Sequence, residues 1–157
     1  AYDMAKFSAM ANAIAKETQV HVQVCESLGI CGEELELTKE SRATMAYSRF
    51  MLDACEGGLL SLLISLASCA FGYAEVGLWA KRHQLPNIAA PYQQWIDEYS
   101  GDDYQSMTHD MLEYLEAYVE RVMPSIEQVD QLQTIWETAT RLEIGMWGEA
   151  LAMGQTT

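Results

Sequence analysis

The segment from Leu59 to about Lys81 most constrains what this chain can fold into, because it is apolar nearly all the way round a helix. Such a helix belongs either in the middle of a helical bundle or in a membrane. The residues that interrupt its apolar run are Ser61, Ser65, Ser68, Tyr73 and Glu75. The uninterrupted apolar part is too short to span a membrane comfortably. The three serines form an i, i + 4, i + 7 stripe on one side of the helix, which lets a neighbouring helix approach closely. We therefore expect a central helix that other helices surround.

The rest of the chain provides amphipathic helices for the same bundle. Apolar residues recur at steps of three and four along further segments, which is the spacing of one helix face. We expect these helices over residues 4–27, 40–55, 92–99, 107–119 and 126–142. Gly57-Gly58 and the three prolines separate the segments, and no stretch shows the period of two that is typical of a strand. The sequence predicts an all-α fold, a helical bundle that forms a single domain over residues 1–157.

The composition of the chain argues against several kinds of partner. Nine Lys and Arg residues against 23 Asp and Glu residues give a formal net charge of −14. A surface this acidic repels nucleic acid and anionic lipid, so we expect no nucleic-acid partner and no membrane partner. The four cysteines show no CxxC pair, which indicates thiols in a reducing compartment. The first residues do not resemble a signal peptide, so we expect a cytoplasmic protein.

No pattern in the sequence predicts a metal site or a phosphate-binding loop. The Cys and His spacings do not bring together a tetrahedral zinc site. A di-iron bundle needs Glu-x-x-His pairs, and the nearest approach, Glu17 to His21, is one residue too long. P-loop, GxGxxG and GxSxG motifs are also missing from the sequence. We expect neither a metal nor a cofactor.

What remains is a small set of reactive side chains on helices that should be buried. Cys69 and Tyr73 are four residues apart, so they share one side of the central helix. Glu143 lies three residues before Met146 and four before Trp147, whose indole would partly desolvate the carboxylate and suit it to proton transfer. A thiol attacks as the thiolate and needs a base. A Cys and a Glu that face each other across a bundle could exchange this proton.

Each of these residues also has an ordinary structural explanation. A Cys on an apolar helix is usually a small core residue. A Glu such as Glu143 usually faces solvent or pairs with a neighbour such as Arg141. Tyr and Trp residues at helical spacing are usually packing residues of the core. From the residues alone, the chain is a helical domain with a candidate thiol site.

Four segments, in the same order along the chain, resemble the TenA/thiaminase II family. They are Ala46-Tyr-Ser-Arg-Phe-Met, Ser68-Cys-Ala-Phe-Gly-Tyr-Ala-Glu-Val-Gly, Tyr92-Gln-Gln-Trp-Ile-Asp-Glu-Tyr-Ser and Thr138-Ala-Thr-Arg-Leu-Glu-Ile-Gly-Met-Trp-Gly-Glu-Ala. The second resembles the family's helix around its nucleophilic Cys, and the fourth resembles its terminal helix, with an acid and a Trp four residues apart. The segments cover about residues 44–151, which makes the resemblance specific.

The resemblance implies the heme-oxygenase-like helical fold, without heme or any other cofactor, and usually a homotetramer. It implies a hydrolase that cleaves the bond between a pyrimidine's methylene carbon and a nitrogen leaving group. In aminomethylpyrimidine, a breakdown product of thiamin, the leaving group is ammonia; in thiamin it is the thiazole. The implied product is hydroxymethylpyrimidine, and the implied role is thiamin salvage with a small-molecule pyrimidine as partner.

Carried over position by position, the resemblance implies that Cys69 is the nucleophile and Glu143 the acid/base. Tyr47, Tyr73 and Tyr99 would line the pyrimidine pocket through ring stacking and hydroxyl contacts. Thiolate addition to the electron-poor ring would ease departure of the leaving group from the neighbouring carbon, and water would then replace that group. Both steps move protons, which is the role implied for Glu143.

The chain departs from the family in three places. The family grips the amino group of the pyrimidine with an Asp in a segment like Gln-Asp-Tyr-x-Tyr, and Ala1-Tyr2 resembles the last two residues of that segment. We therefore expect the chain to lack the N-terminal segment with this Asp, and Tyr2 to be the pocket residue that remains. The stretch between the first helix and Tyr47 looks shorter than is usual. Met146 stands beside Trp147 in the expected pocket wall, where the family often has an aromatic residue.

Three hypotheses about function follow from the sequence. The first is the aminopyrimidine hydrolase just described, which includes thiaminase II activity. The second is a non-catalytic pyrimidine-binding or oligomerisation module of the same fold. The third is a metal-dependent oxidase on a related bundle.

Overall fold

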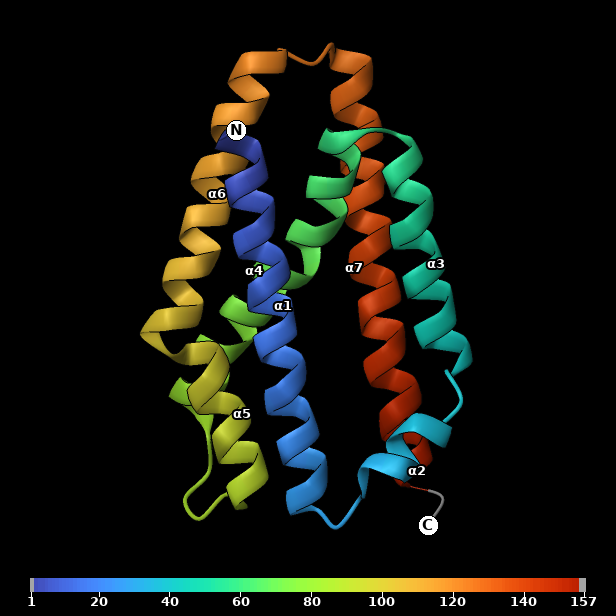
Figure 1. The fold of residues 1–157 in the computed structure, drawn as a ribbon, viewed down its shortest axis with the longest axis vertical. Helices are drawn as coiled ribbons and strands as arrows, with labels where there is room; N and C mark the ends of the chain where they lie inside the picture. The colour runs from blue at the N-terminus through green and yellow to red at the C-terminus, as the bar shows by residue number, and fades with distance from the viewer. Residues whose placement is uncertain (1, 156–157) are drawn as a thin grey trace. The chain divides into compact units, whose positions relative to one another are not determined.

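The computed structural model describes residues 2–155, apart from the side chains of Tyr2 and Asp3, and this part of the chain consists of α-helices and loops (Figure 1). No β-strand occurs among these residues, so the predicted all-α fold is confirmed. The chain divides into two compact units, residues 1–39 and 40–157, which are described separately. The prediction of one domain over residues 1–157 stays a prediction.

The first unit consists of helix α1, Tyr2–Ser27, and the short helix α2, Gly32–Leu37. Helix α1 ends at Ser27, and the turn that follows contains Gly29, whose φ of 84° lies in the left-handed region that glycine adopts at little cost. The sequence pattern did not predict α2, because six residues are too few to show a period. Its capping box also has an unusual N-cap, Cys31, whose backbone N–H donates to Glu34 Oε2 at 3.0 Å.

The second unit contains the five helices that build the candidate site. They are α3, Arg42–Glu56; α4, Leu59–His83; α5, Ala90–Ser100; α6, Asp102–Val122; and α7, Ile126–Gly154. Each begins within three residues of the predicted position, apart from α6. That helix begins directly after Gly101, because Ser100-Gly101 ends α5 without a longer turn.

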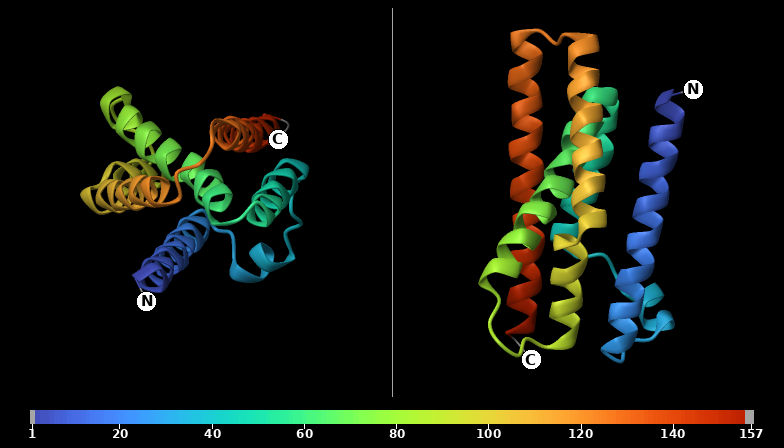
Figure 2. Two further views of the ribbon diagram at one scale, coloured as in Figure 1. Left: turned by 90° about the horizontal axis from the view of Figure 1, so that it is seen from above. Right: turned by 90° about the vertical axis from the view of Figure 1, so that its left-hand side faces the viewer.

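Helix α4 is the central helix of this unit, as its apolar sequence predicts. It contacts all four of the other helices, with α3 and α7 on one side and α5 and α6 on the other (Figure 2). Its buried residues are Ser61, Leu63, Ser65, Ala67, Ser68, Ala74 and Gly77. By length and composition alone the whole of α4, including the residues that interrupt its apolar run, could cross a membrane. Core helices that other helices surround have the same composition.

The predicted stripe of serines along α4 is confirmed as a buried stripe. Ser61, Ser65 and Ser68 are each less than one-tenth exposed, and each hydroxyl donates to a backbone carbonyl one turn earlier in the chain, at 2.7–3.2 Å. Ser65 and Ser68 bond within α4, whereas Ser61 bonds to Gly57 just before it; all three hydroxyls are satisfied, so their burial leaves no unpaired group. Helices can therefore pack closely against α4 at these positions.

Helices α5 and α6 are joined to α4 near the candidate site. The side-chain amide of Gln105, in α6, donates to the carbonyl of Ala74 at 3.1 Å and to that of Tyr99 at 2.8 Å. Tyr99 is only 2% exposed, and its backbone lies against Gly77 of α4. One side chain of α6 thus holds α4 and α5 together where Tyr99 enters the core.

Candidate active site

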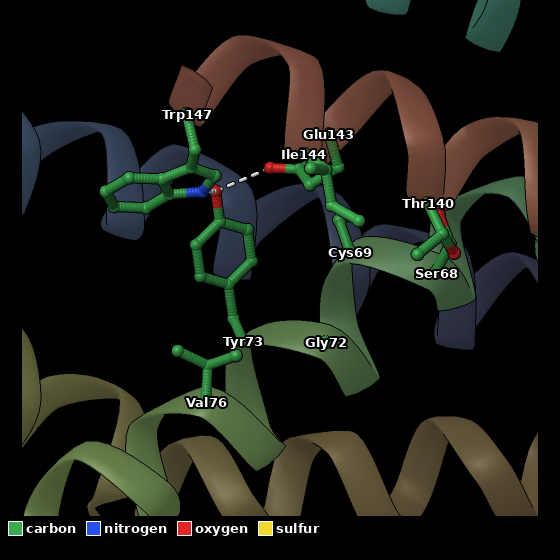
Figure 3. Close-up of a pocket in the computed structure, with 9 residues that line it drawn as sticks. All are labelled: Ser68, Cys69, Gly72, Tyr73, Val76, Thr140, Glu143, Ile144 and Trp147. Carbon is green, nitrogen blue, oxygen red and sulfur yellow. Dashed lines mark hydrogen bonds between the residues drawn. The ribbon is translucent and has the colours of Figure 1, made fainter. Parts of the chain in front are cut away.

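A pocket of about 260 Å³ lies between α4 and α7 (Figure 3). Each helix contributes a stripe with the spacing i, i + 3, i + 4, i + 7, which is one helix face. The stripe on α4 is Cys69, Gly72, Tyr73 and Val76, and the stripe on α7 is Thr140, Glu143, Ile144 and Trp147. Ser68 completes the lining. The pocket is therefore made by two helix faces that oppose each other across the bundle.

Glu143 is the carboxylate of this pocket, and its two oxygens differ in their surroundings. Oε1 accepts a hydrogen bond of 2.6 Å from the hydroxyl of Tyr73, and that hydroxyl accepts a hydrogen bond of 3.2 Å from Nε1 of Trp147 (Figure 3). Oε2 is buried and has no hydrogen-bond partner. A buried carboxylate oxygen without a hydrogen bond is costly, so Oε2 is an unusual feature of the pocket.

Cys69 is the thiol of the same pocket. It is half-buried, and its Sγ donates to the backbone carbonyl of Leu66 at 3.2 Å. Its position one turn before Tyr73 brings the thiol to the same wall as the tyrosine that holds Glu143. Cys69 and Glu143 therefore line one pocket from opposite helices, and the exchange of a proton between them stays a prediction.

Tyr47 comes to the site from α3. Its hydroxyl is buried and makes no hydrogen bond of normal geometry. Burial is the main reason that the pKa of Tyr47 lies far above its usual range. Cys69 and then Glu143 raise that pKa further, each through its charge and through a close polar approach to the Tyr47 hydroxyl. Tyr47 therefore remains a neutral phenol beside the thiol and the carboxylate, with a proton that it can donate.

Tyr73 is also held as a neutral phenol. Burial raises the pKa of Tyr73 well above its usual range, and Glu143 raises it further through the hydrogen bond and through its charge. The hydrogen bond from Trp147 opposes these effects and is too weak to cancel them. Tyr73 consequently keeps its proton at physiological pH and acts as a hydrogen-bond donor.

An aromatic cluster supports the ring of Tyr73 from behind. The ring of Tyr99 stacks on it with centroids 5.0 Å apart, and Trp95 lies 4.7 Å from Tyr99 and 6.0 Å from Trp147. Tyr104 contacts Tyr99 edge-on at 4.8 Å. Such aromatic contacts add to the stability gained by burial and restrict the rings to defined orientations. The cluster therefore fixes the two side chains that form hydrogen bonds towards Glu143.

The predicted site residues fall into three groups. Cys69, Tyr73, Glu143 and Trp147 line the pocket. Tyr47 lies near Cys69 and Glu143, and Tyr99 lies behind Tyr73, without being among the lining residues. Met146 is half-buried on α7 and is not among the lining residues either. The side chain of Tyr2 lies outside the described part of the chain.

Sequence reasoning missed five residues of the pocket wall. They are Ser68, Gly72, Val76, Thr140 and Ile144. The signal that could have found most of them is helical spacing, because residues three, four and seven positions from a catalytic candidate share its face. The residues between α4 and α7 carry no third acidic or metal-binding group near Cys69 and Glu143, and no cluster of three or more His, Cys, Asp or Glu residues occurs within the described chain.

Comparison with proteins of known sequence points to one family. An uncharacterized protein of Haemophilus influenzae is 37% identical over 137 residues, which cover 85% of this chain and 62% of that protein. An aminopyrimidine aminohydrolase of Halalkalibacterium halodurans is 29% identical over 149 residues, which cover 94% of this chain and 66% of the enzyme. The chain thus spans slightly less than two thirds of the length of these relatives.

Solved structures show the same likeness. A structure described as a TenA family transcription regulator, from a Silicibacter species, matches with a TM-score of 0.85 and 36% identity, over 94% of this chain and 67% of that one. A TenA homologue from P. horikoshii matches in fold with a TM-score of 0.76 at 22% identity, over 87% of this chain and 62% of that one. The model of the TENA/THI-4/PQQC family matches residues 1–153. The chain belongs to the TENA/THI-4/PQQC family and has its all-α fold.

Proposed function

We propose that this protein hydrolyses the C–N bond of aminomethylpyrimidine and releases hydroxymethylpyrimidine and ammonia. The observation that carries the proposal is one pocket that holds a thiol, Cys69, and a carboxylate, Glu143, with an unpartnered oxygen. Membership of the family and 29% identity to an aminopyrimidine aminohydrolase support it. The thiol supplies the nucleophile, and the carboxylate supplies the proton transfers that hydrolysis requires.

The proposed reaction balances with these two groups and one water molecule. Glu143 takes the thiol proton as the sulfur of Cys69 adds to the ring carbon next to the one that bears the aminomethyl group. The proton then passes to the leaving nitrogen, the C–N bond breaks, and ammonia departs. Water adds to the methylene carbon while Glu143 takes its proton. The C–S bond finally breaks, the ring becomes aromatic again, and the proton returns to the thiolate.

The walls of the pocket suit a planar, uncharged heteroaromatic ring. Tyr73 and Trp147 provide aromatic faces, and Val76 and Ile144 provide apolar contacts on either side. At about 260 Å³ the pocket is slightly smaller than the usual small-molecule site, roughly 300–1,000 Å³. We therefore propose aminomethylpyrimidine as the main substrate and thiamin, which carries a second ring, as a slower one.

The proposal is tested by measuring hydroxymethylpyrimidine release by three purified variants. We expect Cys69→Ala and Glu143→Gln to lower kcat at least about 100-fold, because each removes a group that acts in a chemical step. The matched control is Cys55→Ala, since Cys55 is an exposed thiol that also donates to a helix carbonyl, that of Met51 at 3.3 Å. The control should keep wild-type turnover. Unchanged turnover in Cys69→Ala, with intact helical circular dichroism, would contradict the proposal.

Calorimetry separates catalysis from simple binding, the second hypothesis from the sequence. Titration of the wild-type protein with hydroxymethylpyrimidine should show saturable binding together with turnover of aminomethylpyrimidine. Tight binding without turnover would instead make the protein a pyrimidine-binding module. Stoichiometric iron or manganese in the purified protein, together with oxidation of the pyrimidine, would favour the third hypothesis.

We also propose a cytoplasmic homo-oligomer, a tetramer by resemblance to the family, that binds neither nucleic acid nor membranes. The thiols and the acidic composition support these assignments. One relative is described as a transcription regulator, but a net charge of −14 opposes binding to DNA. Light scattering coupled to gel filtration measures the oligomeric state, and a dominant monomer would contradict this part of the proposal.

A further inference from the structure

The hydrogen bonds around Glu143 run in one direction, from Trp147 through Tyr73 to the carboxylate. The indole Nε1–H of Trp147 is a donor and cannot accept, so the oxygen of Tyr73 accepts at their contact of 3.2 Å. The single proton of the Tyr73 hydroxyl then points to Oε1 of Glu143, 2.6 Å away. Oε1 is therefore an acceptor in this arrangement.

This direction makes the two oxygens of Glu143 unequal. While Tyr73 donates its proton to Oε1, a proton on the carboxyl group is carried by Oε2. Oε2 is the buried atom without a hydrogen-bond partner. The titratable groups that face Glu143 are Cys69 and Tyr73 from α4 and Tyr47 from α3, the two helices that pack against α7.

We propose that Tyr73 and Trp147 are positioning residues, which tie up Oε1 of Glu143 and leave Oε2 as the oxygen that exchanges protons with the ligand. As pocket-lining side chains, Tyr73 and Trp147 contribute their rings. The positioning role depends instead on the hydroxyl of Tyr73 and on Nε1 of Trp147. The catalytic consequence of the proposal rests on the proposed function of the pocket. The arrangement itself does not, because the hydrogen bonds exist without a ligand.

The surroundings of Tyr73 suit this role. Its raised pKa keeps the hydroxyl protonated, so that it remains a donor to Glu143. Its ring is stacked on Tyr99, which is almost completely buried, and this restricts rotation of the phenol away from the carboxylate. Trp147 is held edge-on against Trp95 at 6.0 Å. The Tyr73 hydroxyl is thus held by a buried stack, and the indole of Trp147, which is 47% exposed, is held on the side of Trp95.

Nuclear magnetic resonance tests the hydrogen-bond chain without reference to activity. The protein has four tryptophans, so its indole N–H spectrum contains four signals, and Trp147→Phe identifies the one that belongs to Trp147. We expect this signal to shift with pH as Glu143 gains a proton. The shift should be lost in Glu143→Gln and in Tyr73→Phe, because either change interrupts the chain. A shift that persists unchanged in Tyr73→Phe would overturn the proposal.

Kinetics test the consequence for proton transfer. Tyr73→Phe keeps the ring and removes the hydroxyl, so we expect kcat to fall about 10–100-fold with little change in KM. Loss of a donor disfavours the charged carboxylate, so the acid limb of the pH–rate profile should move to higher pH. Trp147→Phe should produce a smaller change in the same direction, because Tyr73 can still donate to Glu143.

The matched control is Tyr118→Phe, which removes a phenol hydroxyl from a half-buried ring on α6 that contacts Tyr114 and Arg121. It should leave the indole signal, kcat and the pH–rate profile unchanged. An equal loss of kcat in Tyr118→Phe would assign Tyr73 a structural role and overturn the proposal. A Tyr73→Phe variant in which KM rises and kcat is unchanged would assign it a binding role and overturn the proposal as well. If the indole signal follows Glu143 through Tyr73 but the wild-type protein has no turnover, the proposed function fails and the hydrogen-bond chain stands.

Discussion

At the scale of single residues, Gly77 decides how closely α5 can approach α4. A Cβ atom at this position would lie 2.7 Å from the carbonyl carbon of Tyr99 and 2.8 Å from its Cβ, distances that real side chains do not show. Because Tyr99 supports the ring of Tyr73, the missing side chain of Gly77 contributes directly to the position of the hydroxyl that binds Glu143.

We therefore predict that Gly77→Ala destabilises the protein by about 1–3 kcal/mol, the usual cost of overfilling a packed interface. The matched control is Gly72→Ala on the same helix, where an added Cβ meets nothing within 4 Å. That change should stabilise the protein by up to about 1 kcal/mol, since Ala favours helix over Gly. Urea unfolding measures both effects. Equal stability of the two variants would show that α5 moves away from α4 without cost.

Two buried atoms at the site have no hydrogen-bond partner of normal geometry, the hydroxyl of Tyr47 and Oε2 of Glu143. Leaving a buried polar group unsatisfied costs roughly 1–3 kcal/mol, and such groups are rare in stable cores. The remaining buried side-chain atom without a partner, among those described, is the hydroxyl of Ser100. The concentration of two such atoms around one thiol is typical of a site that a polar ligand completes.

At the scale of helices, α7 holds the beginning of α3. Oε2 of Glu149 accepts hydrogen bonds from the Ser41 hydroxyl and from the backbone N–H of Ala43, at 3.0 Å for the latter. Both groups belong to the first turn of α3, where the helix dipole and unpaired N–H groups favour a negative charge. These hydrogen bonds hold the pKa of Glu149 below its usual range.

A lowered pKa in the folded protein means that the contact stabilises the fold above the ordinary Glu pKa of about 4.3. This stabilisation is lost as the pH falls through the lower, folded-state pKa. We predict that Glu149→Gln lowers the Tm by a few degrees at pH 7 and that the difference from wild type shrinks below about pH 4. Thermal unfolding followed by circular dichroism at both pH values measures this.

The control for this prediction is Glu137→Gln, on the same helix. Glu137 pairs with Arg141 at 3.1 Å on the exposed surface, and exposed pairs of this kind contribute little to stability. Its Tm should therefore differ little from wild type at either pH. If Glu149→Gln lowers the Tm as much at pH 3 as at pH 7, the packing of the Glu149 side chain, and not its negative charge, holds α3 to α7.

At the scale of the whole molecule, the excess of negative charge is the dominant electrostatic feature. With 23 acidic against nine basic residues, most carboxylates have no cation to pair with, and their mutual repulsion destabilises the folded state. The ion pair of Arg141 with Glu137 lies within one helix and on the exposed surface, and that of Arg49 with Glu40 is also largely exposed. They do little to offset this repulsion.

We predict that the Tm rises by several degrees when KCl is increased from about 0.01 M to about 1 M. The Debye length falls from about 30 Å to about 3 Å over this range, which screens the repulsion between carboxylates. Near about pH 4 many carboxylates are protonated, so the same salt increase should have a smaller effect. Calorimetry at both pH values tests this, and a Tm that falls with salt at pH 7 would contradict it.

The sequence alone determined which segments form long helices and which helix lies at the centre. The apolar α4, the periods of the other helices, Gly57-Gly58 and the three prolines were sufficient, because helix formation and capping depend on residues within a few positions of each other. The same local rule identified the neighbours Cys69 and Tyr73 on one helix face. The six residues of α2 were too few for such a pattern.

Only the tertiary structure decided that the face with Cys69 lies opposite the face with Glu143, and that Tyr47 reaches both from a third helix. It also decided that Oε1 of Glu143 is occupied and Oε2 is not. A helical period specifies direction around one axis and contains no information about which other helix lies there. That choice comes from packing between helices, down to single contacts such as Gly77 against Tyr99, and it turns a thiol on an apolar helix into part of a site.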